Sequence, residues 1–97
     1  MSKLSQKNNT EKNTELDINF QKSFEKISKL RKAIAPDVML KFYAYYKQAT
    51  FGNNFTLNSG IDIRNAFKFN AWMQLNGMTS EEAKKEYISL ANSILNK

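Results

Sequence analysis

A lysine stands inside a run of tyrosines and apolar residues over positions 43–50, Tyr-Ala-Tyr-Tyr-Lys-Gln-Ala-Thr. On a helix, positions three, four and seven apart share a face, so Leu40, Tyr43 and Lys47 project to one side. Burying an unpaired charge costs on the order of several kcal/mol, so an apolar stripe rarely contains an ammonium group. Lys47 framed by tyrosines therefore predicts a binding site for a partner with negative charge and a flat or apolar surface.

Lys68 occupies the same kind of position on another predicted helix, beside Ala71 and Trp72. If the two helix edges face each other, they form a cleft with an apolar floor and two ammonium groups. Lysine acts in such a cleft as a point charge for phosphate. The alternative is that each lysine packs its methylene stem on the apolar edge and extends its ammonium into water. For Lys47 or Lys68 taken alone, this alternative is the commoner arrangement.

Other residues near these lysines have two interpretations each. Tyr43 and Tyr46, taken alone, are more typical of a core or its boundary than of a ligand contact. Met39 and Leu40 fit a core, with a smaller chance of lining a site. Tyr87 lies among apolar positions, and its hydroxyl needs a hydrogen-bond partner, which a ligand could supply.

The composition excludes several kinds of chemistry. The 97-residue chain, which suits one small domain, contains neither cysteine nor histidine. It therefore lacks a thiolate nucleophile and a sulfur-ligated metal, as well as the commonest general base and metal ligand. Acidic residues such as Asp37 and Glu81 fall at helix starts, where they suit capping. We predict a binding protein and not an enzyme, with no catalytic residue, no metal and no cofactor.

The net charge of +6 is unevenly distributed. Positive and negative side chains balance up to Asn19, so the whole excess lies from Phe20 onward. A basic folded part attracts phosphate in nucleic acid, lipid headgroups or nucleotides. No apolar run approaches the roughly 20 residues that span a bilayer, and the N-terminus lacks the apolar segment of a secretory signal. We therefore expect a cytoplasmic protein.

Helical periodicity begins near residue 20, and no strand alternation is sustained anywhere. Residues 1–18 are polar and predict a disordered tail, and residues 19–97 predict one helical domain. Thr79 and Glu82 have the spacing of a capping box at the start of the last helix. A polar loop containing Asn-Ser-Gly separates the second and third helices, with Asp62 as a possible cap. The sequence predicts an all-α four-helix bundle, with helices over about 18–32, 36–51, 63–76 and from about 80 to 95.

Three ordered blocks resemble the acyl-CoA-binding protein family, small helical carriers of fatty acyl-CoA esters. The first covers residues 39–50 followed by Gly52, the second is Lys-Phe-Asn-Ala-Trp at 68–72, and the third covers 75–83 with Tyr87-Ile88. The resemblance extends from Phe20 to Leu95 without insertion or deletion before Gly52 or after Asp62. It implies an up-down-down-up bundle with the ligand on one face.

The resemblance also implies roles for residues that match the family pattern. Tyr43 and Lys47 would contact the adenine and the 3′-phosphoribose of CoA, with Tyr46 nearby. Lys68, on the third helix, would neutralise a phosphate of the ligand. Tyr87, on the fourth helix, would reach the nucleotide.

The resemblance also implies contacts with the acyl chain, and some residues differ from the family pattern. Met39 and Leu40 would touch the acyl chain, and Phe67 replaces a small residue beside its path. Phe24 replaces a usually small residue that lies against the adenine, and Ser28 stands where many members have a phosphate-facing lysine.

The leading hypothesis is a monomeric, non-enzymatic carrier and buffer of medium- to long-chain fatty acyl-CoA esters. It predicts no nucleic-acid partner and at most transient membrane contact. The alternative is a basic helical interaction module that binds nucleic acid or an acidic membrane surface. The alternative requires lysines on one continuous exposed face and an affinity that falls steeply with salt.

Overall fold

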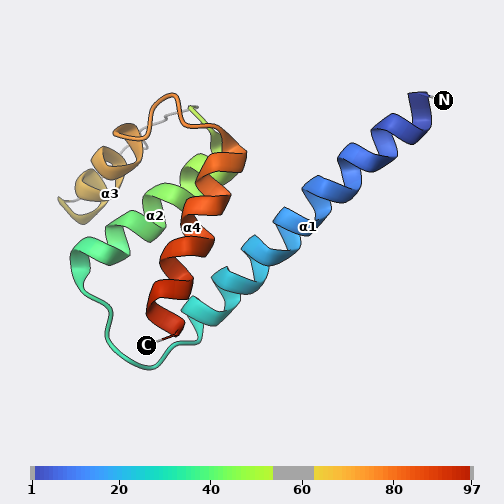
Figure 1. Cartoon of the computed structure of the whole chain (residues 1–97). Coiled ribbons are helices and arrows are strands. Elements are labelled where there is room, and N and C mark those ends of the chain that lie inside the picture. Colours follow the sequence, from blue (N-terminus) through green and yellow to red (C-terminus); the bar gives the residue numbers. More distant parts are fainter. Residues whose placement is uncertain (1, 54–62, 97) are drawn as a thin grey trace.

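The computed structural model describes residues 2–53 and 63–96 and contains four helices within them (Figure 1). No strand occurs in these ranges, so the all-α four-helix prediction is confirmed. The predicted Asn-Ser-Gly loop and the Asp62 cap lie outside the described residues. The helices are α1 (Ser2–Ser28), α2 (Pro36–Phe51), α3 (Ile63–Met73) and α4 (Ser80–Leu95).

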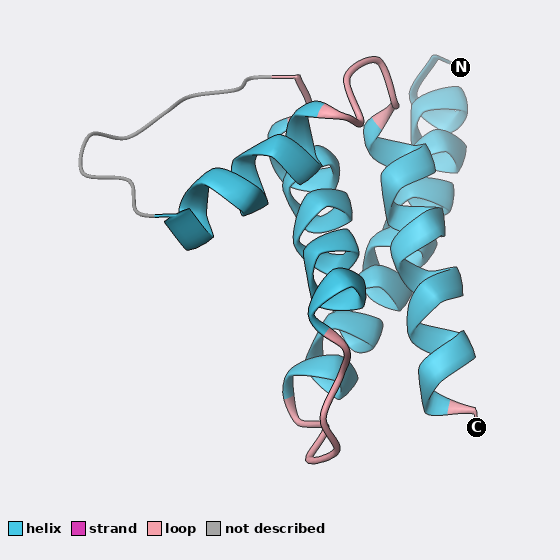
Figure 2. Ribbon diagram, turned by 90° about the vertical axis from the view of Figure 1, so that its left-hand side faces the viewer, coloured by secondary structure: helices cyan, strands magenta, loops and turns pink. Residues whose placement is uncertain are grey.

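The central pair of the bundle is α2 with α4. Helix α1 packs against α4 and helix α3 packs against α2, so α1 and α3 lie on opposite sides of the pair (Figures 1 and 2). Helix α2 therefore packs against α4 along one side and against α3 along another. Side chains of α1 also reach α2, since the ring of Phe24 stacks on that of Tyr46.

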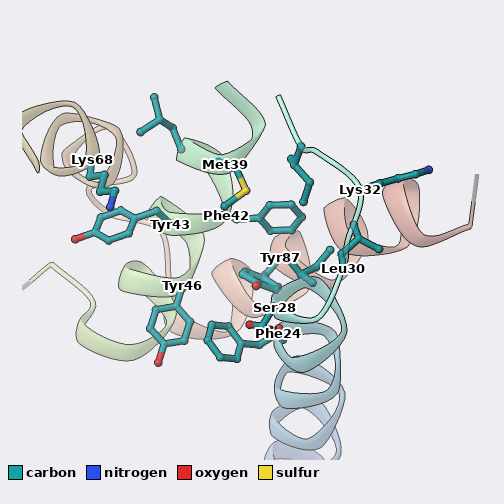
Figure 3. A pocket seen from close by; sticks show the side chains of 13 residues that line it. Phe24, Ser28, Leu30, Lys32, Met39, Phe42, Tyr43, Tyr46, Lys68 and Tyr87 are labelled. Carbon is teal, nitrogen blue, oxygen red and sulfur yellow. Dashed lines mark hydrogen bonds between the residues drawn. The ribbon is translucent and has the colours of Figure 1, made fainter. Parts of the chain in front are cut away.

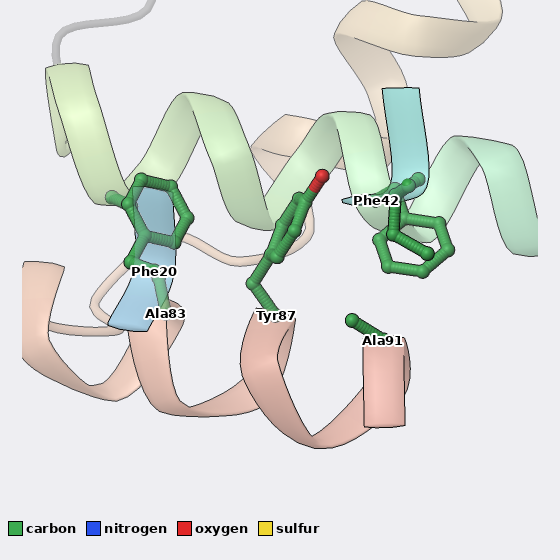
Figure 4. Packing of buried hydrophobic residues seen from close by; sticks show 7 residues of the cluster. Phe20, Phe42, Ala83, Tyr87 and Ala91 are labelled. Atoms are coloured by element: carbon green, nitrogen blue, oxygen red, sulfur yellow. The ribbon is translucent and has the colours of Figure 1, made fainter. Parts of the chain in front are cut away.

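The core is organised around Tyr87 of α4 (Figure 4). Its ring lies 5.1 Å from that of Phe20 in α1 and 4.9 Å from that of Phe42 in α2, centre to centre. Ala83 and Ala91, one turn to either side of Tyr87, are both fully buried. Because these alanines are small, α1 and α2 can approach α4 closely and enclose the Tyr87 ring.

Helix α1 extends further toward the N-terminus than predicted. It begins at Ser2 and not near Ile18, and its first turns project away from the bundle (Figure 1). No proline or glycine interrupts this segment, but it offers few apolar residues, so its sequence lacks the periodicity that marked the packed part. The domain boundary at residue 18 and a disordered tail before it stay predictions.

Several helix ends match the predicted ends and others do not. Pro36 is the first residue of α2, and Gly52, with a positive φ of 61°, follows its last. The Thr79 hydroxyl accepts from the Glu82 N–H at 3.0 Å while Glu82 Oε1 accepts from the Thr79 N–H at 2.9 Å, so the capping box is confirmed. The Thr79 N–H that donates to the Glu82 carboxylate is the main cause of a lowered Glu82 pKa. Helices α1 and α3 end four and three residues before their predicted ends, in tight turns.

A buried side chain joins α2, α3 and the turn before α4. Gln48 is fully buried, and its Nε2 donates to Asn53 Oδ1 at 2.8 Å and to the Met78 carbonyl at 2.7 Å. Its Oε1 accepts from Trp72 Nε1 at 3.0 Å. Asn53 Oδ1 also accepts from the Gly77 N–H. This Gln48 network anchors α3 to α2 near the two lysines that the sequence singled out.

Candidate functional site

An open cavity of about 480 Å³ lies where α1, α2 and α4 meet, and α3 contributes one residue to it (Figure 3). Its lining is mainly aromatic and aliphatic. The structure brings eight of the ten predicted contact residues into this one cavity: Phe24, Ser28, Met39, Leu40, Tyr43, Tyr46, Lys68 and Tyr87.

The two predicted lysines meet at one aromatic ring. Lys47 Nζ lies 5.7 Å from the centre of the Tyr43 ring, and Lys68 Nζ lies 5.5 Å from the same centre. Figure 3 shows the Lys68 ammonium beside Tyr43 at one end of the cavity. Two ammonium groups from separate helices therefore converge at the edge of an apolar cavity.

Lys47 itself does not line the cavity. Its ammonium also lies 4.3 Å from the centre of the Phe51 ring and 5.4 Å from that of Trp72. A cation over an aromatic face gains about 0.5 to 2 kcal/mol, the larger value where water is excluded. Three rings therefore hold the half-buried Lys47 ammonium in place, next to the cavity edge that Tyr43 forms.

Phe67 also lies elsewhere than in the main cavity. It is 57% exposed and borders a second cleft of about 460 Å³ between α2 and α3. Leu40 lines both the main cavity and this second cleft. The two spaces therefore adjoin at Leu40, and Met39 and Phe67 face different ones.

Aromatic rings fill the wall between α1 and α2. Phe24 stacks on Tyr46 with ring centres 4.9 Å apart and an interplanar angle of 27°, and it lies 6.4 Å from Tyr87. The Ser28 hydroxyl donates to the Phe24 carbonyl at 2.8 Å. Because that bond uses its only proton, Ser28 does not offer a free donor to the cavity.

The sequence missed five residues of the lining. Four are apolar, and their residue types do not distinguish them in a sequence from an ordinary helical core: Ile27, Leu30, Ile34 and Phe42. The fifth is Lys32, which the predicted helix over about 18–32 would place in its last turn. Because α1 ends at Ser28, Lys32 instead lies in the connection to α2. No glycine or proline follows residue 28 directly, so the sequence carries no strong signal for this helix end.

Burial shapes the chemistry of the tyrosines. It raises the pKa of Tyr87 to about 12, with a smaller contribution from the neighbouring Tyr46. Burial also raises the pKa of Tyr43. Both phenols therefore stay neutral at physiological pH. A neutral phenol can donate a hydrogen bond to an anionic ligand and does not repel it.

We expect the protein to lose folding stability at alkaline pH, and we expect the Tyr87→Phe variant to lose less. An unfolded tyrosine has a pKa of about 10, whereas the pKa of folded Tyr87 is about 12. Between these values the unfolded chain releases the phenol proton and the folded protein keeps it, so stability falls as pH rises. Below about pH 10 this contribution is fully present.

Urea unfolding of both proteins, at several values between about pH 8 and pH 12, measures this effect. The stability of the parent should fall relative to that of Tyr87→Phe once the pH passes about 10. Parallel stability curves throughout would contradict the assigned burial of the phenol.

This architecture defines a class of protein: a helical binder whose apolar cavity is edged by cations and tyrosines. Residues 17–91 match the family described as Acyl CoA binding protein. The acyl-CoA-binding protein of Saccharomyces cerevisiae is 35% identical over 79 residues, covering 80% of this chain and 91% of that protein. The Drosophila melanogaster homolog is also 35% identical over 79 residues, covering 80% and 92%.

The fold agrees with these matches. The crystal structure of Oryza sativa Acyl-CoA-Binding Protein 2 superposes with a TM-score of 0.76 at 33% identity, covering 84% of this chain and 91% of that one. The chain belongs to the acyl-CoA-binding protein family, a family of non-enzymatic binders. The resemblance inferred from the three sequence blocks is thereby confirmed, as is the bundle that it implied.

Proposed function

We propose that this protein binds medium- to long-chain fatty acyl-CoA esters reversibly, buffering and carrying them in the cytoplasm as a monomer. The observation that carries the proposal is the convergence of the Lys47 and Lys68 ammonium groups on Tyr43, at the edge of an apolar cavity. An acyl-CoA ester has the matching chemistry, with phosphates and a flat base at one end and a hydrocarbon chain at the other.

The CoA nucleotide would bind at the end of the cavity that carries the lysines. Lys68 and Lys47 would each meet a phosphate, since charge-assisted hydrogen bonds gain strength where water is partly excluded. Tyr43 and Tyr46 would supply flat surface for the adenine. Tyr87 would donate its neutral hydroxyl from α4.

The acyl chain would follow the apolar residues of α2. Met39 and Leu40 line the main cavity, and Leu40 with Phe67 lines the adjoining cleft. A chain that passes over Leu40 would therefore have apolar surface on both sides. Each buried methylene contributes about 0.8 kcal/mol. Ten of them contribute about 8 kcal/mol, from which ordering costs are subtracted.

Calorimetric titration with palmitoyl-CoA, octanoyl-CoA and free CoA tests the proposal. We expect palmitoyl-CoA to bind at least about a hundredfold more tightly than CoA, because methylene burial exceeds the ordering cost of the chain. Octanoyl-CoA should lie between them. Equal affinities for palmitoyl-CoA and CoA would exclude the acyl-binding part of the proposal.

The proposal includes neither a nucleic-acid partner nor a stable membrane association. The described helices include none with the length and hydropathy that a membrane crossing needs. Lys47 and Lys68 each lie beside the Tyr43 ring, at 5.7 and 5.5 Å from its centre. A gel-shift experiment with duplex DNA at physiological salt is the matching control, and we expect no shift.

A further inference from the structure

Phe51, the last residue of α2, places an aromatic ring beside the ammonium group of Lys47. It follows Lys47 by four residues, so the two side chains share a face of α2. The Lys47 Nζ lies 4.3 Å from the centre of the Phe51 ring. That is shorter than its distances of 5.7 Å to the Tyr43 ring and 5.4 Å to the Trp72 ring. Phe51 is thus the nearest of the three rings around this cation.

The Phe51 ring belongs neither to the buried core nor to the cavity lining. It is 51% exposed, and it lines neither the main cavity nor the second cleft. Its centre lies 6.1 Å from that of Trp72, with the two ring planes tilted by 55°. The Lys47 ammonium lies within about 6 Å of both centres, the range in which a ring face attracts a cation. The two rings therefore hold the ammonium between them from outside the cavity.

Rings, and not a counter-ion, set the place of this ammonium. Among residues 15–53 and 66–96, no carboxylate forms an ion pair with Lys47, and the ion pair seen there joins Lys84 to Asp17. A lysine ammonium has three N–H donors. A ring face occupies one side of the group, so other donors still point away from the ring. Lys47 can therefore keep its contact with Phe51 and donate to an anion at the same time.

We propose that Phe51 is a positioning residue for acyl-CoA binding, which holds the Lys47 ammonium in place for the ligand without contacting the ligand itself; this rests on the proposed function. A lysine side chain that is unrestricted in the free protein must be ordered on binding. For a side chain with many rotamers, that ordering weakens affinity about two- to twelvefold. Because the Phe51 ring already restricts Lys47 in the free protein, part of this loss is avoided.

Calorimetric titration of the full chain with palmitoyl-CoA compares the parent with Phe51→Leu and Phe51→Tyr. Leucine keeps an apolar side chain next to Trp72 but has no ring face, so we expect binding to weaken about fivefold. Tyrosine keeps the ring face, so Phe51→Tyr should bind as the parent does. Unchanged binding by Phe51→Leu overturns the proposal. Tighter binding also overturns it, because the ring would then compete with the ligand for Lys47.

A double-mutant cycle with Lys47→Ala separates positioning from a merely structural effect. Once the ammonium is absent there is nothing to position, so adding Phe51→Leu to Lys47→Ala should change the affinity less than about twofold. An equal loss in both backgrounds would show that Phe51 acts without Lys47, and would overturn the proposal. If Lys47→Ala weakens binding and Phe51→Leu does not, the proposed function stands and the role of Phe51 falls. A parent protein that does not bind palmitoyl-CoA overturns both.

Proton NMR of the protein without ligand gives a readout that does not depend on binding. Protons above the face of an aromatic ring are shielded by its ring current and resonate upfield. The ε-methylene protons of Lys47 are bonded to the carbon next to Nζ, so we expect them upfield of ordinary lysine values in the parent and in Phe51→Tyr. In Phe51→Leu they should move toward ordinary values. The same resonance position in the parent and in Phe51→Leu would contradict the ring contact and overturn the proposal.

Discussion

Replacing Gln48 with leucine is expected to destabilise the protein by about 3 kcal/mol, although the two side chains have similar volume. The change removes the donor to the Met78 carbonyl and the Asn53 side chain, and one of the acceptors of the Trp72 indole. A buried polar group left without a partner costs about 1 to 3 kcal/mol. The Trp72 N–H keeps its bond to the Gly52 carbonyl at 3.1 Å, which limits the loss.

Urea unfolding followed by far-UV circular dichroism measures the Gln48→Leu effect. Gln21→Leu is the matched control, because Gln21 is exposed on α1 and its replacement should change stability by less than about 0.5 kcal/mol. If both variants unfold at the same urea concentration, the buried network does not stabilise the fold.

The Gln48 variant should also weaken the binding of acyl-CoA. Lys47 precedes Gln48 directly, and Lys68 lies one helical turn before Trp72. The network therefore sets the distance at which the two ammonium groups approach Tyr43. Loss of that constraint lets α3 shift on α2, so we expect palmitoyl-CoA binding to weaken even under conditions where the variant is fully folded.

Replacing Lys47 or Lys68 with alanine is expected to weaken palmitoyl-CoA binding at least about tenfold each, or about 1.4 kcal/mol. Each replacement removes a cation that would meet a phosphate in a partly desolvated place. The double variant should lose about a hundredfold if the two act independently. Because both ammonium groups lie beside Tyr43, some departure from additivity is expected.

Calorimetric titration gives the affinities, and Lys85→Ala is the control, since Lys85 is exposed on α4 and does not line the cavity. The urea midpoint of Lys47→Ala must be measured too, because the variant also loses cation–π contacts with Phe51 and Trp72. An unchanged affinity in a folded Lys47→Ala would remove Lys47 from the site. The same result for Lys68→Ala would remove the second predicted phosphate contact.

Local features of the sequence predicted much of this fold. Pro36 marks the start of α2 because the proline ring fixes φ near the helical value. Gly52 marks its end because glycine accepts a positive φ. The Thr79–Glu82 spacing marks the start of α4 because both hydrogen bonds lie within one turn. Leu40 and Tyr43 could be grouped on one helical face because their spacing follows the helical period, and both line the main cavity. These signals depend on neighbouring residues alone.

Contacts between helices could not be derived in this way. Three features depend on how α2 and α3 cross. Lys47 and Lys68 meet at one ring, and Gln48 is buried. Phe67 and Met39 line separate spaces. A helical period specifies the face on which a side chain lies, but not which neighbour packs against that face. The place of Lys32 depends on where α1 ends, and no capping residue in the sequence marked that point. Only the packed tertiary structure made one cavity from these separate helical faces.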